Sequence, residues 1–325
     1  MKILALDGIA PEGITYLEKQ GFTVDQKPSQ TEAELIEIIP SYNGLLVRSG
    51  TRVTAKALAA AGKLQVIGRA GVGVDNIDLE EASRRGIQVV NSPNGNTVAA
   101  AEHTMALLLS LARNVPRAHA QLKQGRWERK TFTGVELAGK VLGVLGLGKV
   151  GTAVARRAQA FEMKVIGYDP YLPRERVRKL GVEIASLEDV LCQADFLTLH
   201  LPLTPETRHM IGREQLALVK PTAMLVNVAR GGIIAEDALY HALAAGQVAG
   251  AALDVFEEEP ARENPLFSLD NVIVTPHLGA STREAQIRVA VEVAEDIAGI
   301  LRGEPPVNPV NRPVQKPWGL KKVAF

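Results

Sequence analysis

The sequence predicts an α/β protein built from two doubly wound domains, each a parallel sheet covered on both faces by helices. Three observations lead to this prediction: the length of the chain, its apolar content and an alternation of strand and helix patterns that occurs twice. The chain has 325 residues, about two domains at roughly 150 residues each, and 46% of the residues are hydrophobic. Repeated strand–helix alternation is typical of parallel sheets whose strands are joined by helical crossovers.

The first series of alternating patterns precedes a polar Asn-Ser-Pro-Asn-Gly-Asn turn at residues 91–96. Short apolar runs bounded by Gly, Pro or Asn are the expected strands, at residues 2–6, 44–47, 65–67 and 87–90. Helical patterns separate them, at residues 11–20, 31–39, 54–61 and 79–85. This series predicts the first domain.

The second series follows a long helix expected from Val98 to about Arg113. Its strands are expected at residues 141–145, 164–168, 196–199, 224–228, 249–255 and 272–275. A second long helix is expected over residues 282–301, either capping this domain or returning to the first. The tail from residue 303 to 325 holds five prolines and no helical period, so we expect an extended arm.

The composition of the chain argues against several classes of protein. Lys and Arg number 37 and Asp and Glu 36, a net charge of +1, which argues against a nucleic acid or an anionic membrane as partner. Aromatic residues are 4%, too few for stacking on bases. A single Cys192 and scattered histidines predict neither a disulfide framework nor a metal site. The apolar start ends at Asp7, too early for a signal peptide, and no apolar run approaches ~18 residues, so we expect a cytoplasmic protein.

The segment from Lys140 to Gly151 contains Gly146, Gly148 and Gly151 in the Gly-x-Gly-x-x-Gly spacing, after an expected strand and at the start of an expected helix. The first glycine permits a tight turn, the second lets the backbone approach a pyrophosphate, and the third lets helix and strand pack closely. The helix N-terminus supplies N–H groups and a positive dipole end for the phosphates. Asp169 ends the next expected strand, where its carboxylate can bind ribose hydroxyls and would repel a 2′-phosphate. The sequence therefore predicts NAD rather than NADP as cofactor.

Three polar residues follow expected strands of the second domain: Arg230, Glu259 and His277. Ligands of open α/β sheets bind at the carboxyl ends of the strands. Hydride transfer to or from a 2-hydroxy acid needs a general acid/base at the hydroxyl and a cation for the carboxylate, roles that suit His and Arg. A neighbouring carboxylate would favour the protonated histidine. Taken singly, each residue also fits a surface ion pair, a solvated glutamate or a turn histidine.

Seven segments carry a resemblance to a known family: residues 47–49, 68–78, 91–96, 125–130, 227–232, 254–260 and 276–282. On these segments, the sequence resembles the D-isomer-specific 2-hydroxyacid dehydrogenases over about residues 1–305. The resemblance implies that Arg230 binds the substrate carboxylate and polarises C2, that His277 takes the hydroxyl proton, and that Glu259, rather than Glu257 or Glu258, stabilises the imidazolium.

The resemblance also implies a set of residues around the cofactor, with Asp254 on the nicotinamide carboxamide. The expected cofactor-binding residues are Val72, Gly146, Gly148, Lys149, Val150, Gly151, Asp169, Leu201, Val228, Ala229, Arg230, Asp254, His277, Gly279 and Ala280.

A cluster of cations suggests a phosphorylated substrate, and the resemblance implies D-3-phosphoglycerate, oxidised with NAD in serine biosynthesis. The expected substrate-binding residues are Arg48, Ser49, Arg69, Gly71, Arg129 and Lys130. A glyoxylate or hydroxypyruvate reductase is the alternative, since it needs less cationic charge at the far end of the substrate. A more remote alternative is a non-enzymatic, NAD-sensing corepressor of the same fold.

The resemblance finally implies how the chain is organised. The substrate-binding domain, flavodoxin-like and discontinuous, is expected at residues 1–97 plus 283–325, and the NAD-binding Rossmann domain at 98–282, with the active site in the cleft between them. A homodimer or larger homo-oligomer is expected, joined through residues 98–133. Longer members of the family carry a C-terminal regulatory domain that this chain lacks, so it is expected to be a short form or a truncated chain, without feedback control by serine.

Overall fold

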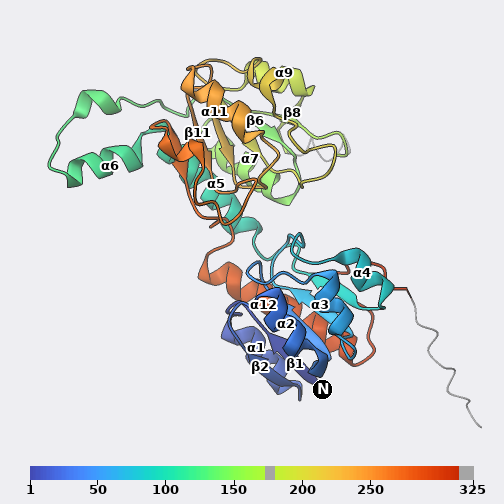
Figure 1. Cartoon of the computed structure of the whole chain (residues 1–325). Helices are drawn as coiled ribbons and strands as arrows, with labels where there is room; N and C mark the ends of the chain where they lie inside the picture. Colours follow the sequence, from blue (N-terminus) through green and yellow to red (C-terminus); the bar gives the residue numbers. More distant parts are fainter. Residues whose placement is uncertain (173–179, 315–325) are drawn as a thin grey trace, which may run out of the picture. The chain divides into compact units, whose positions relative to one another are not determined.

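The computed structural model describes residues 1–172 and 180–314, which form two compact units. Unit 1 contains residues 1–96 and the segment that begins at Ala280, and unit 2 contains Thr97–Gly279. Each unit has one all-parallel sheet, of five strands in unit 1 and seven in unit 2 (Figure 1). The predicted fold class, two doubly wound α/β domains, is confirmed.

Unit 1 has the strand order β2-β1-β3-β4-β5. The strands are β1 (Lys2–Ala5), β2 (Thr23–Gln26), β3 (Gly44–Val47), β4 (Val66–Arg69) and β5 (Gln88–Asn91). The edge strand β2 was not expected from the sequence, because its TVDQ segment is short and polar and only part-buried. The chain order reverses between β1 and β3, and such a switch point opens a crevice at the carboxyl ends of the strands.

Helices cover both faces of the sheet of unit 1, over two separate apolar clusters. They are α1 (Pro11–Lys19), α2 (Glu32–Ile38), α3 (Ala55–Ala60), α4 (Leu79–Arg84) and α12 (Arg283–Leu301), with the 3₁₀ turn η1 (Ile39–Ser41) after α2. Side chains cap the N-termini of α2, α3 and α4, from Thr31, Thr54 and Asp78. The long helix α12 returns to unit 1, where it packs against α1 and β4. A Cβ on Gly68 would lie 2.3 Å from Val293 Cγ1, so this glycine lets α12 approach the sheet.

The described part of the tail runs along the free edge of β5. Val90 and Pro309 form an antiparallel bridge, and Val310 N–H donates to the carbonyl of Val89 (2.9 Å). The side chain of Asn311 accepts from Val89 N–H (2.7 Å). The tail therefore supplies partners for backbone groups that an edge strand leaves unpaired.

Unit 2 has the strand order β12-β11-β10-β9-β6-β7-β8. The strands are β6 (Val141–Leu145), β7 (Lys164–Tyr168), β8 (Glu183–Ile184), β9 (Phe196–Leu199), β10 (Met224–Asn227), β11 (Gly250–Leu253) and β12 (Val272–Val274). Successive residues face opposite cores, as Leu225 and Val226 do on β10. The chain order reverses between β6 and β9, the switch point of this sheet.

The described helices of unit 2 include α5 and α7 over one apolar cluster and α9, α10 and α11 over the other. They are α5 (Thr97–Ala112), α6 (Val115–Lys123), α7 (Lys149–Ala160), α9 (Leu187–Gln193), α10 (Arg213–Leu216) and α11 (Glu236–Ala244), with the 3₁₀ turns η2 (Arg129–Phe132) and η3 (Pro265–Ser268). No helix in the part of the chain that the structure describes is both long and apolar enough to cross a membrane.

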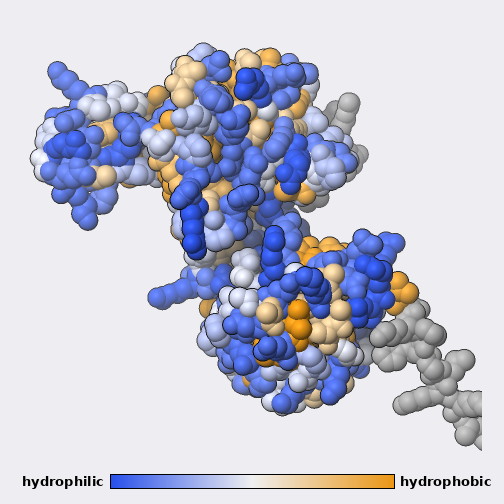
Figure 2. All heavy atoms as spheres, viewed as in Figure 1, coloured by the Kyte–Doolittle hydropathy of each residue, from blue (hydrophilic) through white to orange (hydrophobic). Residues whose placement is uncertain are grey.

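Residues 113–134, with α6 and η2, form an arm that extends from the body of unit 2 (Figure 1). Neither α6 nor η2 has a buried residue. On the face shown in Figure 2 the arm is mostly hydrophilic, although Val115, Leu122 and Trp127 are 52%, 53% and 75% exposed. At least half of the surface of each of these apolar side chains is therefore exposed.

Candidate active site

The turn after β6 carries the three glycines, and each meets a different steric demand. Gly146 has φ +90°, and a Cβ there would lie 2.6 Å from the carbonyl oxygen of His200. A Cβ on Gly151 would lie 2.0 Å from the Gly146 carbonyl oxygen, so this glycine allows α7 to begin directly against the turn. A Cβ on Gly148 would meet nothing within 4 Å. Gly148 is therefore not required by the packing of the protein itself, which leaves close approach of a ligand as its reason.

The residues at this turn fit a dinucleotide. Gly148 is the N-cap of α7 and provides no side-chain cap, so the first turn of the helix is open to an anion. Asp169 follows β7, and its Oδ2 and Oδ1 accept hydrogen bonds from Leu147 N–H (2.9 Å) and Tyr171 N–H (3.0 Å). Each carboxylate oxygen keeps a second lone pair, which can accept from a ribose hydroxyl. Arg174, five residues after Asp169 in the sequence, lies outside the described residues.

His200 lies at the end of β9, beside the glycine turn. Its N–H donates to Leu145 O (2.7 Å), and its ring contacts the hydroxyl of Thr198 (Nε2 to Oγ1, 3.0 Å). Burial of the ring lowers the pKa of His200 to about 3, because the imidazolium would lose its hydration. The imidazole is therefore neutral at physiological pH.

Three turns at the carboxyl ends of β10, β11 and β12 pack directly against one another. A Cβ on Gly231 would lie 1.8 Å from Phe256 O, so the turn after β10 touches the turn after β11. A Cβ on Gly279 would lie 2.8 Å from Val228 Cγ1, so the turn after β12 touches the turn after β10. The sequence-predicted residues Val228, Ala229, Arg230, Glu259, His277 and Gly279 lie on these turns. The structure thus gathers them at one edge of the sheet.

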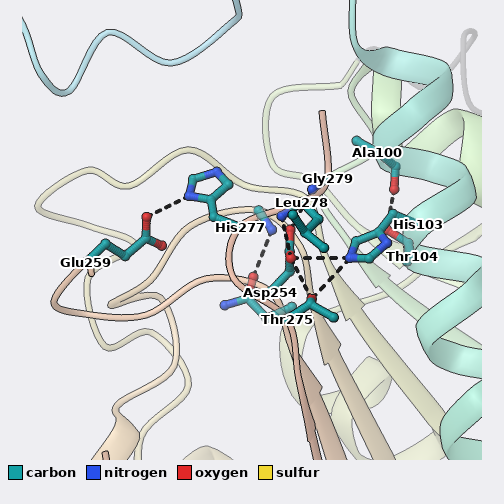
Figure 3. A network of polar contacts seen from close by, with 11 residues as sticks. Ala100, His103, Thr104, Asp254, Glu259, Thr275, His277, Leu278 and Gly279 are labelled. Carbon is teal, nitrogen blue, oxygen red and sulfur yellow. Dashed lines mark hydrogen bonds and ion pairs between the residues drawn. The ribbon is translucent and has the colours of Figure 1, made fainter. Parts of the chain in front are cut away.

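Glu259 and His277 form a hydrogen bond, with Nδ1 of the imidazole 2.7 Å from Oε2 of the carboxylate (Figure 3). The other carboxylate oxygen accepts from Phe256 N–H (3.1 Å). Because a carboxylate only accepts, Nδ1 carries a hydrogen, which leaves Nε2 of a neutral imidazole as the acceptor. The side chains of His277 and Glu259 are 44% and 35% exposed, so the pair is accessible to a substrate. This is the arrangement of a general base and the residue that orients it.

Glu257, two residues earlier, is engaged elsewhere. Its Oε1 lies 3.1 Å from His209 Nε2 and accepts from Glu236 N–H (3.0 Å). The structure therefore separates the adjacent glutamates by their partners, and only Glu259 meets His277 among these contacts.

Arg230 follows β10 on a turn held by Asn227. The Asn227 side chain accepts from Ala229 N–H (3.0 Å) and donates to the carbonyl of Arg230 (2.9 Å). The Arg230 guanidinium donates to the carbonyl of Ala229 (2.7 Å) and is part-buried. A guanidinium on a turn at this edge of the sheet has the planar pair of N–H donors that can bind a carboxylate bidentately.

Asp254 lies directly after β11, whereas the strand pattern over 249–255 placed it inside a strand. Its side chain is fully buried. Oδ1 accepts from Leu278 N–H (2.7 Å) and from the Thr275 hydroxyl (2.6 Å), and Oδ2 from Gly279 N–H (2.7 Å). Burial acts to raise the pKa of Asp254, but hydrogen bonds from His103, Thr275 and Leu278 outweigh it and hold the pKa below its ordinary value. Asp254 is thus an anion that holds the turn of residues 277–279; its expected contact with the carboxamide stays a prediction.

In unit 1, the loop after β3 carries Arg48 and Ser49 at the switch point of the sheet. Asp7, after β1, accepts from Arg48 N–H (2.8 Å) and from the N–H and hydroxyl of Thr51 (3.1 and 2.6 Å). The Asn76 side chain donates to the carbonyls of Arg48 and Thr51 (2.8 and 2.7 Å). Two polar side chains, Asp7 and Asn76, therefore hold the backbone of the loop that carries Arg48.

Further residues predicted from the sequence to bind substrate or cofactor are divided between unit 1 and the arm of unit 2. Arg69 ends β4, and its guanidinium occupies the space beside Gly71, where a Cβ would lie 1.6 Å from Nη1. Val72 and Ala280 belong to unit 1. Arg129 and Lys130 are exposed on η2, in the arm of unit 2. The cations expected around a phosphate are therefore divided between the two units.

Sequence reasoning missed the residues that hold these side chains in place: Asp7, Asn76, His103, Asn227 and Thr275. Each is a polar residue in or beside an apolar segment, a pattern shared by many solvent-exposed positions. Asp7 carried the clearest sequence signal, because it directly follows the first expected strand. In the structure its φ is +66°, a conformation that Asn, Asp and Gly adopt more readily than other residues.

A glycine turn at the switch point, an acid after the next strand and a polar edge with an acid/base pair define a dinucleotide-binding protein of the doubly wound class. The sequence profile described as D-isomer specific 2-hydroxyacid dehydrogenase, NAD binding domain, matches residues 105–279, more than half of the chain. The chain belongs to the D-isomer-specific 2-hydroxyacid dehydrogenase family, and NAD is the cofactor of its unit 2.

The relatives of the chain agree with this assignment. It is 55% identical over 314 residues to D-3-phosphoglycerate dehydrogenase of Methanocaldococcus jannaschii, covering 96% of this chain and 60% of that protein. The crystal structure of the TT0316 protein from Thermus thermophilus matches with a TM-score of 0.87 and 36% identity, covering 95% and 100% of the two chains. D-lactate dehydrogenase from Aquifex aeolicus, complexed with NAD and lactic acid, matches with a TM-score of 0.82 and 29% identity, covering 93% and 96%. The chain spans about 60% of the length of the curated relatives it matches.

Proposed function

We propose that the protein oxidises D-3-phosphoglycerate to 3-phosphooxypyruvate with NAD, as a step of serine biosynthesis. The observation that carries the chemistry is the 2.7 Å pair of Glu259 and His277, on the same sheet edge as Arg230 and the glycine turn. Relatives that share about half of their residues with this chain are named D-3-phosphoglycerate dehydrogenase, which supports the substrate.

In the proposed reaction, Arg230 binds the substrate carboxylate through its guanidinium and orients C2. His277 donates from Nδ1 to Glu259, which leaves Nε2 to accept the proton of the C2 hydroxyl. The Glu259 carboxylate stabilises the imidazolium that forms. NAD, held by the turn of residues 146–151 and by Asp169, supplies the acceptor for the hydride that leaves C2. In the reverse direction, protonated His277 returns the proton to the oxygen.

Two sets of residues are the candidates for binding the substrate phosphate: Arg48 and Arg69 of unit 1, with Ser49 and Gly71, and Arg129 and Lys130 of the arm of unit 2. Guanidinium groups suit a dianionic phosphate because they offer planar pairs of N–H donors. The fixed loop of Arg48 supports this role, since a preorganised cation loses little conformational freedom on binding.

Two substrates and one pair of variants test this proposal. A charge-assisted hydrogen bond contributes ~1.5–3 kcal/mol, so Arg129→Ala should lower kcat/KM for D-3-phosphoglycerate by ~10- to 150-fold. The same change should leave an unphosphorylated 2-hydroxy acid almost unaffected. Arg126→Ala, on the same arm, is the control, and we expect it to change neither. Equal losses for both substrates at Arg129→Ala would contradict phosphate binding and favour a glyoxylate or hydroxypyruvate reductase.

We also propose that the protein is a cytoplasmic homodimer joined through the arm. The support is the exposure of Val115, Leu122 and Trp127 on a segment with no buried residue in α6. Trp127→Asp together with Leu122→Asp should halve the mass measured by light scattering. An unchanged mass would place the contact between subunits elsewhere.

A further inference from the structure

One histidine outside the proposed acid/base pair contacts the network that holds His277. His103 lies on α5, and its side chain is 20% exposed. Its Nε2 lies 3.2 Å from both Asp254 Oδ1 and Thr275 Oγ1 (Figure 3). This contact joins residues 103, 254 and 275 from three separate elements, at the carboxyl ends of β11 and β12.

The partners of His103 determine which of its nitrogens carries a hydrogen. Asp254 only accepts, since hydrogen bonds hold its carboxylate in the ionised form. The hydroxyl hydrogen of Thr275 is already used, because this hydroxyl donates to Asp254 Oδ1 at 2.6 Å. Nε2 of His103 therefore carries a hydrogen and donates it to both oxygens, in a three-centre hydrogen bond.

Asp254 forms hydrogen bonds to the backbone of the turn that carries His277, the proposed acid/base residue. Its own carbonyl accepts from His277 N–H (2.9 Å), and its carboxylate accepts from the N–H groups of Leu278 and Gly279. His277 has φ +55°, a left-handed conformation that a residue with a Cβ adopts at a cost. Such a conformation persists only where neighbouring groups determine it, and Asp254 supplies three of those hydrogen bonds.

We propose that His103 is a positioning residue for His277. By donating to Asp254 and Thr275, it fixes the carboxylate whose hydrogen bonds set the turn of residues 277–279, and so the direction in which the imidazole of His277 faces Glu259. This inference rests on the proposed dehydrogenase function for its kinetic part, and on the hydrogen-bond network alone for its structural part.

The glutamine variant provides the sharpest test, because its side-chain amide can donate from nearly the position of Nε2. In His103→Leu we expect kcat to fall by ~10- to 100-fold, the loss that follows a misplacement of about 1 Å at a reacting group. His103→Gln should restore kcat to within ~3-fold of the wild type.

A second measurement does not depend on activity. Amide hydrogen exchange at residues 277–279 should become faster in His103→Leu and stay at the wild-type rate in His103→Gln. Thr104→Val is the matched control: Thr104 is buried on the same helix, but its hydroxyl donates to Ala100 O and not to this network. We expect that variant to leave exchange at 277–279 unchanged. If His103→Leu fails to fold, Thr275→Val removes another donor to Asp254 and should produce the same faster exchange.

The outcomes separate the two proposals. Unchanged exchange at 277–279 in a folded His103→Leu protein, or a glutamine variant as impaired as the leucine variant, would overturn the positioning role. A wild-type protein that exchanges as expected but oxidises no 2-hydroxy acid would overturn the proposed function and leave the network intact.

Discussion

Gly148 and Gly151 lie three residues apart in the same turn, yet substituting each by alanine should have different consequences for stability. Gly148 has φ −64° and ψ −158°, which residues other than glycine can adopt, and its added methyl group meets no atom within 4 Å. Alanine is a poorer N-cap than glycine by ~0.5–1 kcal/mol, but it lowers the entropy of the unfolded chain by a similar ~0.4–1 kcal/mol. The free energy of unfolding of Gly148→Ala should therefore stay within ~1 kcal/mol of the wild type.

Binding of NAD to Gly148→Ala should weaken, because the methyl group occupies the side from which the pyrophosphate approaches the backbone. Losing one charge-assisted hydrogen bond to a phosphate costs ~1.5–3 kcal/mol, so we expect the Kd for NAD to rise by ~10- to 150-fold. Calorimetric titration with NAD gives the Kd, and urea denaturation of the same samples gives the stability. Gly62→Ala is the control, since its Cβ also meets nothing within 4 Å, and it should change neither quantity.

Gly151→Ala should lose stability as well as NAD binding. Its methyl group would lie 2.0 Å from the Gly146 carbonyl oxygen, so helix α7 must shift. Such overpacking costs ~1–3 kcal/mol of stability, and binding is lost together with it. An unchanged Kd for NAD in a stable Gly148→Ala protein would refute the assignment of this turn to the pyrophosphate.

Three further predictions concern the cofactor, the acid/base pair and the response to pH. Because the Asp169 carboxylate would face the 2′-phosphate of NADP, kcat/KM with NAD should exceed kcat/KM with NADP by ~30- to 1,000-fold. Equal values of kcat/KM would contradict the assignment of Asp169 to the ribose of the cofactor. His277→Ala should lower kcat by ~10²–10⁴-fold and leave the Kd for NAD nearly unchanged. Glu259→Gln should lower kcat less, since its amide oxygen still accepts a hydrogen bond from Nδ1 of His277. A Kd for NAD that rises in step with the loss of kcat would argue against an acid/base role for His277. The pKa of His200 is about 3 in the folded state, below its value of 6.5 in the unfolded state, so the unfolded state binds the proton first as the pH falls. The free energy of unfolding should therefore fall by up to ~1.4 kcal/mol per pH unit below about pH 6.5. In denaturation series between pH 7 and 5, His200→Gln should show a shallower decline, and equal slopes would contradict the neutral buried ring.

The sequence alone predicted the parts of this protein that depend on local pattern. The strands of both sheets are short apolar runs whose neighbours are turn residues, and the glycine turn combines a strand, a spacing and a helix in one continuous segment. Arg230, Glu259 and His277 became candidates because each lies after a strand pattern, and the resemblance to the dehydrogenase family assigned their roles and selected Glu259 from three consecutive glutamates. The strands β2 and β8 were missed because an edge strand of two to four part-exposed or exposed residues has no apolar pattern to detect.

The tertiary structure decided which of these polar residues meet. Three consecutive glutamates have nearly the same local sequence context. The packing of the turns determines that Glu259 contacts His277 and that Glu257 contacts His209. Asp254 matched a cofactor contact by resemblance, yet it is fully buried and its carboxylate binds the turn of residues 277–279. His103 lies 151 residues from Asp254 along the chain, so no spacing rule connects them. Local pattern fixes where strands end, because it reflects the geometry of neighbouring residues, but hydrogen bonds between distant elements exist only after the sheet has aligned those ends.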